Sequence, residues 1–181
     1  MRIGVLSDSH GRAETTARAV GVLVQAGVDV LIHLGDVGSE AVIDELVGHD
    51  AHVVFGNCDF DHKALGRYAE SVGVRNHHPA GTLQADGTVV CFTHGHLERE
   101  MRSLLESKPG YLLHGHTHET RDESDGSTRI VNPGALFRAS RYTVAVVDTD
   151  RDNVEFRPVE KSQDGNGNHV KQHETGRASE Q

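Results

Sequence analysis

Five apolar segments of this chain each end in a short polar segment rich in aspartate, asparagine and histidine. The apolar segments are residues 2–6, 28–34, 51–55, 88–92 and 111–114. Apolar runs of this length suit buried strands of a parallel sheet, and helical spacing of apolar residues separates the first three. The alternation predicts an α/β fold. In such folds the carboxyl ends of neighbouring strands meet at one edge, where ligands bind.

Helices are expected to follow the polar segments. Apolar residues at helical spacing predict a helix from residue 13 to near Gly27 and a second buried stripe over residues 42–47. A third helix is expected over residues 97–105, and a weaker signal lies near residues 62–71.

The second half of the chain predicts more β-structure. Asp86 and Gly87 form a strong two-residue hairpin signal between two apolar runs. Residues 122–126 are expected to form a turn, and residues 142–159 to form a closing hairpin.

Seven polar side chains lie at the expected strand ends and together have the composition of a metal-ligand set. They are Asp8, His10, Asp36, Asn57, His94, His116 and His118. Two carboxylates, one amide oxygen and four imidazoles suit two borderline divalent ions, with one carboxylate placed to bridge them. A single aspartate at a strand end is usually a turn residue or a helix cap. That interpretation does not account for all seven.

The order and spacing of these motifs resemble those of the calcineurin-like metallophosphoesterases. The motifs are Asp8-Ser9-His10, Gly35-Asp36, Gly56-Asn57-x-Asp59, Thr93-His94-Gly95-His96 and Gly115-His116-Thr117-His118. The chain is most similar to the small archaeal and bacterial phosphodiesterase branch, which is related to the scaffold subunit of the eukaryotic retromer complex. Asn132-Pro133-Gly134 also matches that branch, and the resemblance covers roughly residues 1–160.

The resemblance implies a four-layer metallophosphoesterase fold, in which helices flank two packed mixed β-sheets. It also implies a dinuclear site with Asp8, His10 and His118 on one ion, Asn57, His94 and His116 on the other, and Asp36 bridging. The ions could be Mn, Ni, Co, Fe or Zn, and a bridging hydroxide would attack a phosphodiester. Asp59 is expected to orient a ligand or the substrate rather than to bind metal.

One position departs from the pattern of many family members, which carry histidine where this chain has Cys58. A thiol near its reference pKa of ~8.5 is a poor acid, so we expect a preference for esters with acidic leaving groups. Simple space-filling beside the metal is the other interpretation of Cys58. His96 is the alternative proton donor or phosphate contact, whereas His33 and His114 are not expected to bind metal.

Two other classes of function remain open. The fold could serve as a catalytically silent protein-interaction scaffold, or the histidines could hold a structural zinc ion. Structural zinc sites are closed and usually rich in cysteine, and this set is neither. All seven positions hold competent ligands, which favours the enzyme over the scaffold.

Charge limits the expected partners. The formal net charge is −9, from 27 acidic and 18 basic residues, and no basic cluster is visible. Such a surface disfavours nucleic acid, so a small phosphate ester is the expected substrate. The acid-rich, lysine-poor composition also suggests a halophile, with a salt-rich cytoplasm.

Location and organisation follow from simpler features. No apolar run approaches the ~20 residues of a membrane span, so a cytoplasmic protein is expected. Two cysteines are too few for a disulfide framework. Residues 1–160 are expected to form one domain and residues 161–181 a disordered polar tail. A homodimer is possible, because dimers are the commonest oligomers.

Overall fold

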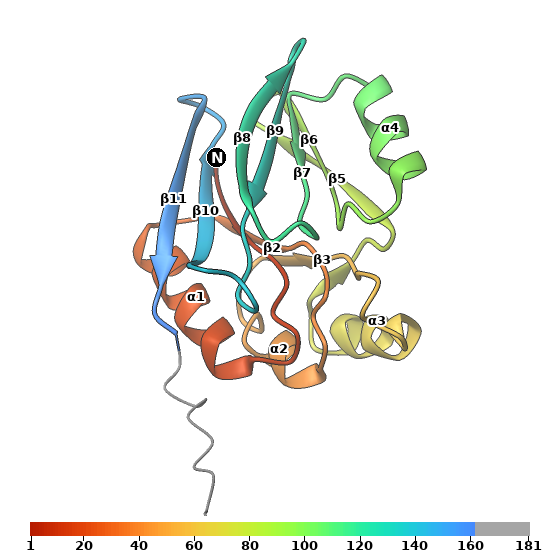
Figure 1. Ribbon diagram of the computed structural model, residues 1–181, viewed down its shortest axis with the longest axis vertical. Coiled ribbons are helices and arrows are strands. Elements are labelled where there is room, and N and C mark those ends of the chain that lie inside the picture. Colours follow the sequence, from red (N-terminus) through yellow and green to blue (C-terminus); the bar gives the residue numbers. More distant parts are fainter. Residues whose placement is uncertain (162–181) are drawn as a thin grey trace, which may run out of the picture.

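The structure is a computed structural model that describes residues 1–161 (Figure 1). Its elements are, in order, β1 (Arg2–Leu6), α1 (Ala13–Gln25), β2 (Val30–His33), α2 (Glu40–Asp44), β3 (Ala51–Val53), α3 (His62–Ser71), β4 (Arg75–Asn76), β5 (Ala80–Ala85), β6 (Thr88–Thr93), α4 (Glu98–Glu106), β7 (Tyr111–Leu113), β8 (Thr120–Asp125), β9 (Thr128–Pro133), β10 (Tyr142–Asp148) and β11 (Asn153–Val159). Among these residues no helix is long and apolar enough to cross a bilayer.

Two mixed sheets form the centre of the molecule. The six-stranded sheet has the order β11-β10-β1-β2-β3-β4, and the five-stranded sheet has the order β5-β6-β7-β9-β8. Strands β1 to β4 are parallel neighbours, and so are β6, β7 and β9. Each sheet therefore presents a row of carboxyl ends along one edge, and these two edges carry the polar motifs.

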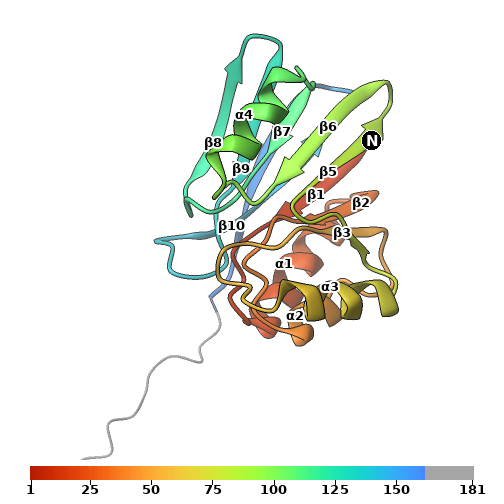
Figure 2. The same cartoon turned by 90° about the vertical axis from the view of Figure 1, so that its right-hand side faces the viewer.

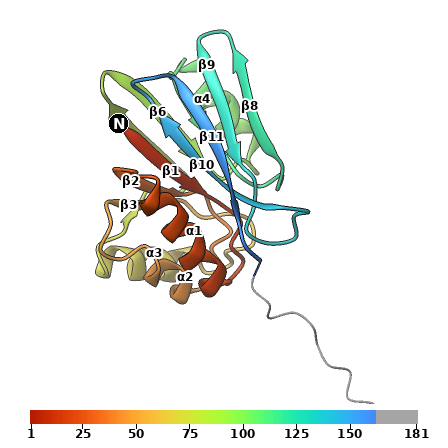
Figure 3. The same ribbon diagram turned by 90° about the vertical axis from the view of Figure 1, so that its left-hand side faces the viewer.

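Helices cover the outside of both sheets. Figure 2 shows α1, α2 and α3 against the six-stranded sheet and α4 on the outer face of the five-stranded sheet. In Figure 3 the six-stranded sheet runs from the β10–β11 hairpin across β1 to β3, with α1 packed against it. The fold thus has four layers, and the predicted fold class is confirmed.

The alternation of side chains along β1 divides the apolar core in two. Ile3 and Val5 point into the layer between the sheets, where they join Phe92 and Leu113. Leu6 points the other way, into the layer beneath the helices. This is the period-two pattern of a strand buried on both faces. Burial of each such side chain contributes about 1.5–3 kcal/mol to the stability of the fold.

Three local expectations differ from the structure. The turn expected at residues 122–126 is wrong for its first part, because residues 122–125 belong to the exposed edge strand β8. Helix α2 ends at Asp44, and Val47 at the end of the predicted stripe is exposed. The apolar stripe predicted for α4 is only half-buried. From residue 162 onward the predicted tail lies outside the described residues.

Candidate metal centre

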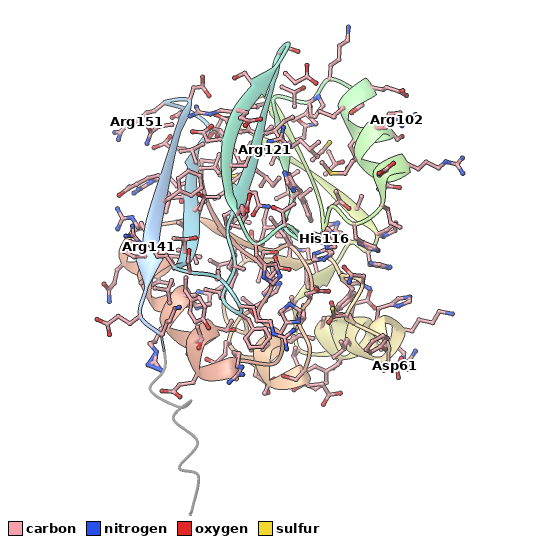
Figure 4. All side chains as sticks on the ribbon, in the orientation of Figure 1. Asp61, Arg102, His116, Arg121, Arg141 and Arg151 are labelled. Atoms are coloured by element: carbon pink, nitrogen blue, oxygen red, sulfur yellow. The ribbon has the colours of Figure 1, made fainter. Side chains whose placement is uncertain are left out.

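The seven predicted ligands all follow strands that end at the same place in the fold. Asp8 and His10 follow β1, whose loop is joined to that of β2 by the Asp8 N–H to Gly35 O bond of 3.0 Å and the His10 N–H to Asp36 O bond of 2.8 Å. From the five-stranded sheet, the N–H of His116 donates to Asp8 Oδ2 at 3.1 Å. The loops of both sheets therefore meet, near the His116 label at the centre of Figure 4.

Asp8, His10 and His118 form one side of the cluster. His118 Nε2 lies 3.2 Å from Asp8 Oδ1, and the rings of His10 and His118 are 5.6 Å apart. The other oxygen of Asp8 accepts the Ser7 hydroxyl at 2.6 Å. Asp8 Oδ1 and His10 Nε2 are both inaccessible to water, and His10 Nε2 has no hydrogen-bond partner among the described residues. A cation placed between them would satisfy both atoms.

His94, Asn57 and His116 form the other side. His94 Nδ1 lies 2.8 Å from the carbonyl oxygen of Leu34, which can only accept, so a neutral His94 carries its proton there. Its Nε2 is then an acceptor, yet it lies 3.2 Å from Asn57 Oδ1, which is also an acceptor. The ring of His116 is 5.2 Å from that of His94. Two acceptor atoms that face each other without a donor between them would both be satisfied by one metal ion.

Asp36 lies between the two sides. Its Oδ2 is 3.5 Å from His10 Nε2, and its Oδ1 is 3.6 Å from His94 Nε2. The N–H of Cys58 donates to Oδ1 at 2.8 Å. One carboxylate thus directs a different oxygen toward each side of the cluster.

The charge states follow from these contacts. Burial raises the pKa of Asp8, but the contacts with His118 and Ser7 outweigh burial, so the pKa lies below its ordinary value. The contact with Asp8 raises the pKa of His118. The site therefore holds at least one buried carboxylate that stays ionised near neutral pH.

Five of the seven predicted ligands have a left-handed backbone. The φ angles are 57° for Asp8, 45° for His10, 50° for Asp36, 71° for His116 and 61° for His118. Such angles are uncommon outside glycine, and they concentrate at functional sites when the surrounding structure imposes them. The sequence gives no direct sign of this strain.

Two glycines make the close packing of these loops possible. A side chain at Gly56 would collide with Asp36 Oδ1 and would lie 2.7 Å from His94 Nε2. A side chain at Gly115 would collide with the Ser7 hydroxyl and would lie 2.9 Å from Asp8 Oδ2. Both positions therefore require glycine for close approach.

Asp59 holds the backbone of two loops. Its buried carboxylate accepts N–H bonds from Gly56 at 2.8 Å, Val37 at 3.1 Å and Gly38 at 2.8 Å. These donors flank Asp36 and Asn57. Asp59 thus orients the loops that carry two predicted ligands.

Asn132 does the same for the turn that carries His116, a role that the sequence analysis did not assign. Its buried amide donates to Gly115 O at 2.9 Å and to Thr117 Oγ1 at 3.0 Å, and its Oδ1 accepts the N–H of Gly134 at 2.9 Å. The Asn132-Pro133-Gly134 motif is visible in the sequence, but the motif alone does not show that Asn132 bonds to Gly115 and Thr117 in another loop.

Three further residues surround the cluster. The His96 ring lies 5.3 Å from that of His94, and burial, followed by His94 and His116, lowers its pKa. Burial raises the pKa of the Cys58 thiol to about 11, so the thiol stays protonated. His33 is fully buried and its Nε2 lies 2.8 Å from Ser9 Oγ.

The sequence of residues 1–152 matches the family model of the calcineurin-like phosphoesterase superfamily domain. The chain belongs to this superfamily. Phosphodiesterase MJ0936 of Methanocaldococcus jannaschii is 26% identical over 165 residues, which is 88% of this chain and 98% of that protein. The resemblance to the calcineurin-like family and the prediction of a phosphoesterase are therefore confirmed.

Solved structures of other proteins share the fold. A novel archaeal phosphodiesterase superposes with a TM-score of 0.79 at 23% identity, covering 88% of this chain and 100% of the other. Vps29 from Entamoeba histolytica superposes with a TM-score of 0.60 at 16% identity, covering 88% of this chain and 100% of that one.

The residues present fit the divalent ions that the superfamily implies. Asp8, His10 and His118 place their ligand atoms within 4.8 Å of one another, as do Asp8, Asp36 and His94. Imidazole and carboxylate donors suit Mn, Fe, Co, Ni and Zn alike. His10, Asp36 and Cys58 form a third such group, so the thiol adjoins the predicted bridge.

Proposed function

We propose that this chain is a metal-dependent phosphodiesterase with two divalent ions. In this proposal Asp8, His10 and His118 hold one ion, Asn57, His94 and His116 hold the other, and Asp36 bridges them. Small phosphate esters are the substrates, in keeping with the family and with the net charge of −9.

The observation that carries the proposal is the placement of Asp36. Each of its oxygens faces a different imidazole, at 3.5 Å and 3.6 Å. A carboxylate that served only one ion would not need to direct one oxygen toward each of two imidazole nitrogens on opposite sides of the cluster.

The chain's own residues would perform distinct tasks. Bound divalent ions supply charge neutralisation at the phosphate and a water of lowered pKa. Asp8 and Asp36, both buried, bring the negative charge that holds cations at the strand ends. Asn57 and His116 are exposed and form the side of the site that a substrate can reach from solvent.

His96 stands beside this open side. Its lowered pKa keeps the imidazole neutral at neutral pH, which favours a phosphate contact through an N–H over proton donation. With the Cys58 thiol pKa raised to about 11, neither group is an effective acid for a poor leaving group. We therefore expect aryl phosphodiesters to react faster than alkyl ones.

A catalytically silent scaffold is the alternative, since Vps29 shares this fold. The complete set of ligand side chains favours the enzyme. Activity and ion content separate the two.

The test uses metal-stripped protein and bis-p-nitrophenyl phosphate, with Mn²⁺, Ni²⁺, Co²⁺, Zn²⁺ and Mg²⁺ added in turn. At least one metal should restore hydrolysis, with two ions bound per chain by elemental analysis. Asp36→Ala should lose turnover and at least one ion, whereas His49→Ala, at an exposed histidine, should change neither. Folded protein that binds two ions and hydrolyses nothing would falsify the proposal.

A further inference from the structure

Two arginines contact one aromatic ring beside the candidate metal centre. The loop between β9 and β10 carries Phe137, whose ring centroid lies 5.1 Å from that of His10. Arg12 Cζ lies 4.8 Å from the centre of the Phe137 ring, and Arg138 Cζ lies 5.1 Å from it. Cation–π contacts of this kind hold a guanidinium in place while its N–H groups stay free.

The loop that carries Phe137 and Arg138 is fixed to the candidate metal centre. The N–H of Leu136 donates to Ser7 O at 3.2 Å, next to Asp8. A backbone hydrogen bond with Arg138 is one of the contacts of the His118 side chain. Phe137 and Arg138 thus adjoin the two imidazoles proposed for one ion.

Charge makes the pair unusual for this protein. The chain has 27 acidic residues and 18 basic ones, yet neither Arg12 nor Arg138 forms an ion pair within residues 1–161. Both residues are exposed. Two guanidinium groups that contact the same ring and have no carboxylate partner would each attract an anion bound beside that ring.

We propose that Arg12 and Arg138, held on Phe137, form a subsite for a second phosphate group of the substrate. This inference rests on the proposed phosphodiesterase function. The scissile diester would lie on the metals, and a terminal phosphate on one of its ester arms would accept N–H bonds from the guanidinium forks. Arginine suits this task because its fork binds phosphate oxygens in pairs. The substrate class is therefore a phosphodiester that carries an additional phosphate monoester.

The test compares two probes that differ only in that group. They are the p-nitrophenyl ester of thymidine 5′-phosphate and the same ester with a 3′-phosphate. The wild-type metal-loaded protein should show a kcat/KM about tenfold or more higher for the 3′-phosphorylated probe, as expected for charge-assisted hydrogen bonds. Raising the salt concentration should reduce this preference, because the contacts are near the surface.

Variants test whether Arg12 and Arg138 cause the preference for the 3′-phosphorylated probe. Arg12→Gln combined with Arg138→Gln should bring the two kcat/KM values together and leave that of the unphosphorylated probe within about twofold. Arg102→Gln is the matched control, since Arg102 is exposed on the outer helix α4 and also forms no ion pair within residues 1–161 (Figure 4). Melting temperature and bound metal should be unchanged in all three proteins.

The outcomes separate this inference from the proposed function. Equal rates on both probes in the wild-type protein overturn the subsite, and so does a double variant that slows both probes equally. Hydrolysis of bis-p-nitrophenyl phosphate without hydrolysis of either nucleotide probe also overturns it, while leaving the phosphodiesterase proposal in place. If the metal-loaded protein hydrolyses no diester at all, the proposed phosphodiesterase function is itself wrong.

Discussion

Replacing His116 by glycine is expected to leave the metal-free protein more stable than replacing it by alanine, the reverse of the usual order. Both variants remove the imidazole, and they differ by a single methyl group. His116 is exposed and has a φ of 71°, so the difference between the variants reports backbone strain rather than lost packing.

The magnitude follows from two opposing contributions. A left-handed backbone costs an L-residue about 1–2 kcal/mol. The greater freedom of glycine in the unfolded chain offsets about 0.4–1 kcal/mol of that advantage. From the middle of each range, we expect His116→Gly to exceed His116→Ala by about 0.8 kcal/mol in the free energy of unfolding, or about 2–3 °C in melting temperature.

The assay is urea unfolding in the presence of a chelator, followed by far-ultraviolet circular dichroism. Asn57 provides the matched control, because it is also an exposed proposed ligand but does not have a positive φ. There the order should invert, with Asn57→Ala more stable than Asn57→Gly by about 0.4–1 kcal/mol. Alanine more stable than glycine at both positions would refute the argument that His116 is strained.

Four further results are expected. Asp59→Asn should lower the free energy of unfolding by about 1–3 kcal/mol in urea titrations, because an amide cannot accept all three N–H bonds; an unchanged midpoint would count against this role. Burial lowers the pKa of His33 from 6.5 to about 4, so the imidazole is neutral in the folded protein and stability should fall as the pH drops through this range. The loss should reach about 3 kcal/mol by urea titration of metal-free protein, and His33→Gln should flatten the profile. Cys58→His should raise the ratio of alkyl to aryl phosphodiester hydrolysis at least about tenfold, because an imidazole can protonate an alkoxide; an unaltered ratio would leave Cys58 a space-filling residue. A halophilic protein should melt at higher temperature as KCl rises toward molar concentration, and a flat or falling curve would count against that hypothesis.

Sequence reasoning succeeded where short motifs end apolar runs. Asp8 and Asp36 each follow a strand whose apolar pattern is unmistakable, so their convergence at one edge could be inferred from parallel topology alone. His94 follows β6 of the other sheet, so its approach to them depends on how the two sheets pack. The weak helix near residues 62–71 is present as α3.

Other features depend on contacts that no local pattern records. Residues 120–125 are almost wholly polar, and they form a strand because β9 supplies their hydrogen-bond partners at an exposed edge. The role of Asn132 depends on Gly115 and Thr117 in another loop. The left-handed backbones are likewise imposed by tertiary structure.

The proposed ligands are divided between the two sheets, with Asp36 on one and His94 and His116 on the other. Neither half of the chain carries a complete coordination set. Bound ions would cross-link the loops of the two sheets at the edge where the ligands lie. The two sheets, which otherwise pack through apolar side chains, could then not slide past each other while the ions stayed in place. Chelation would remove this cross-link. Amide hydrogens in the loops after β1 and β7 should then exchange with solvent well before those inside the strands.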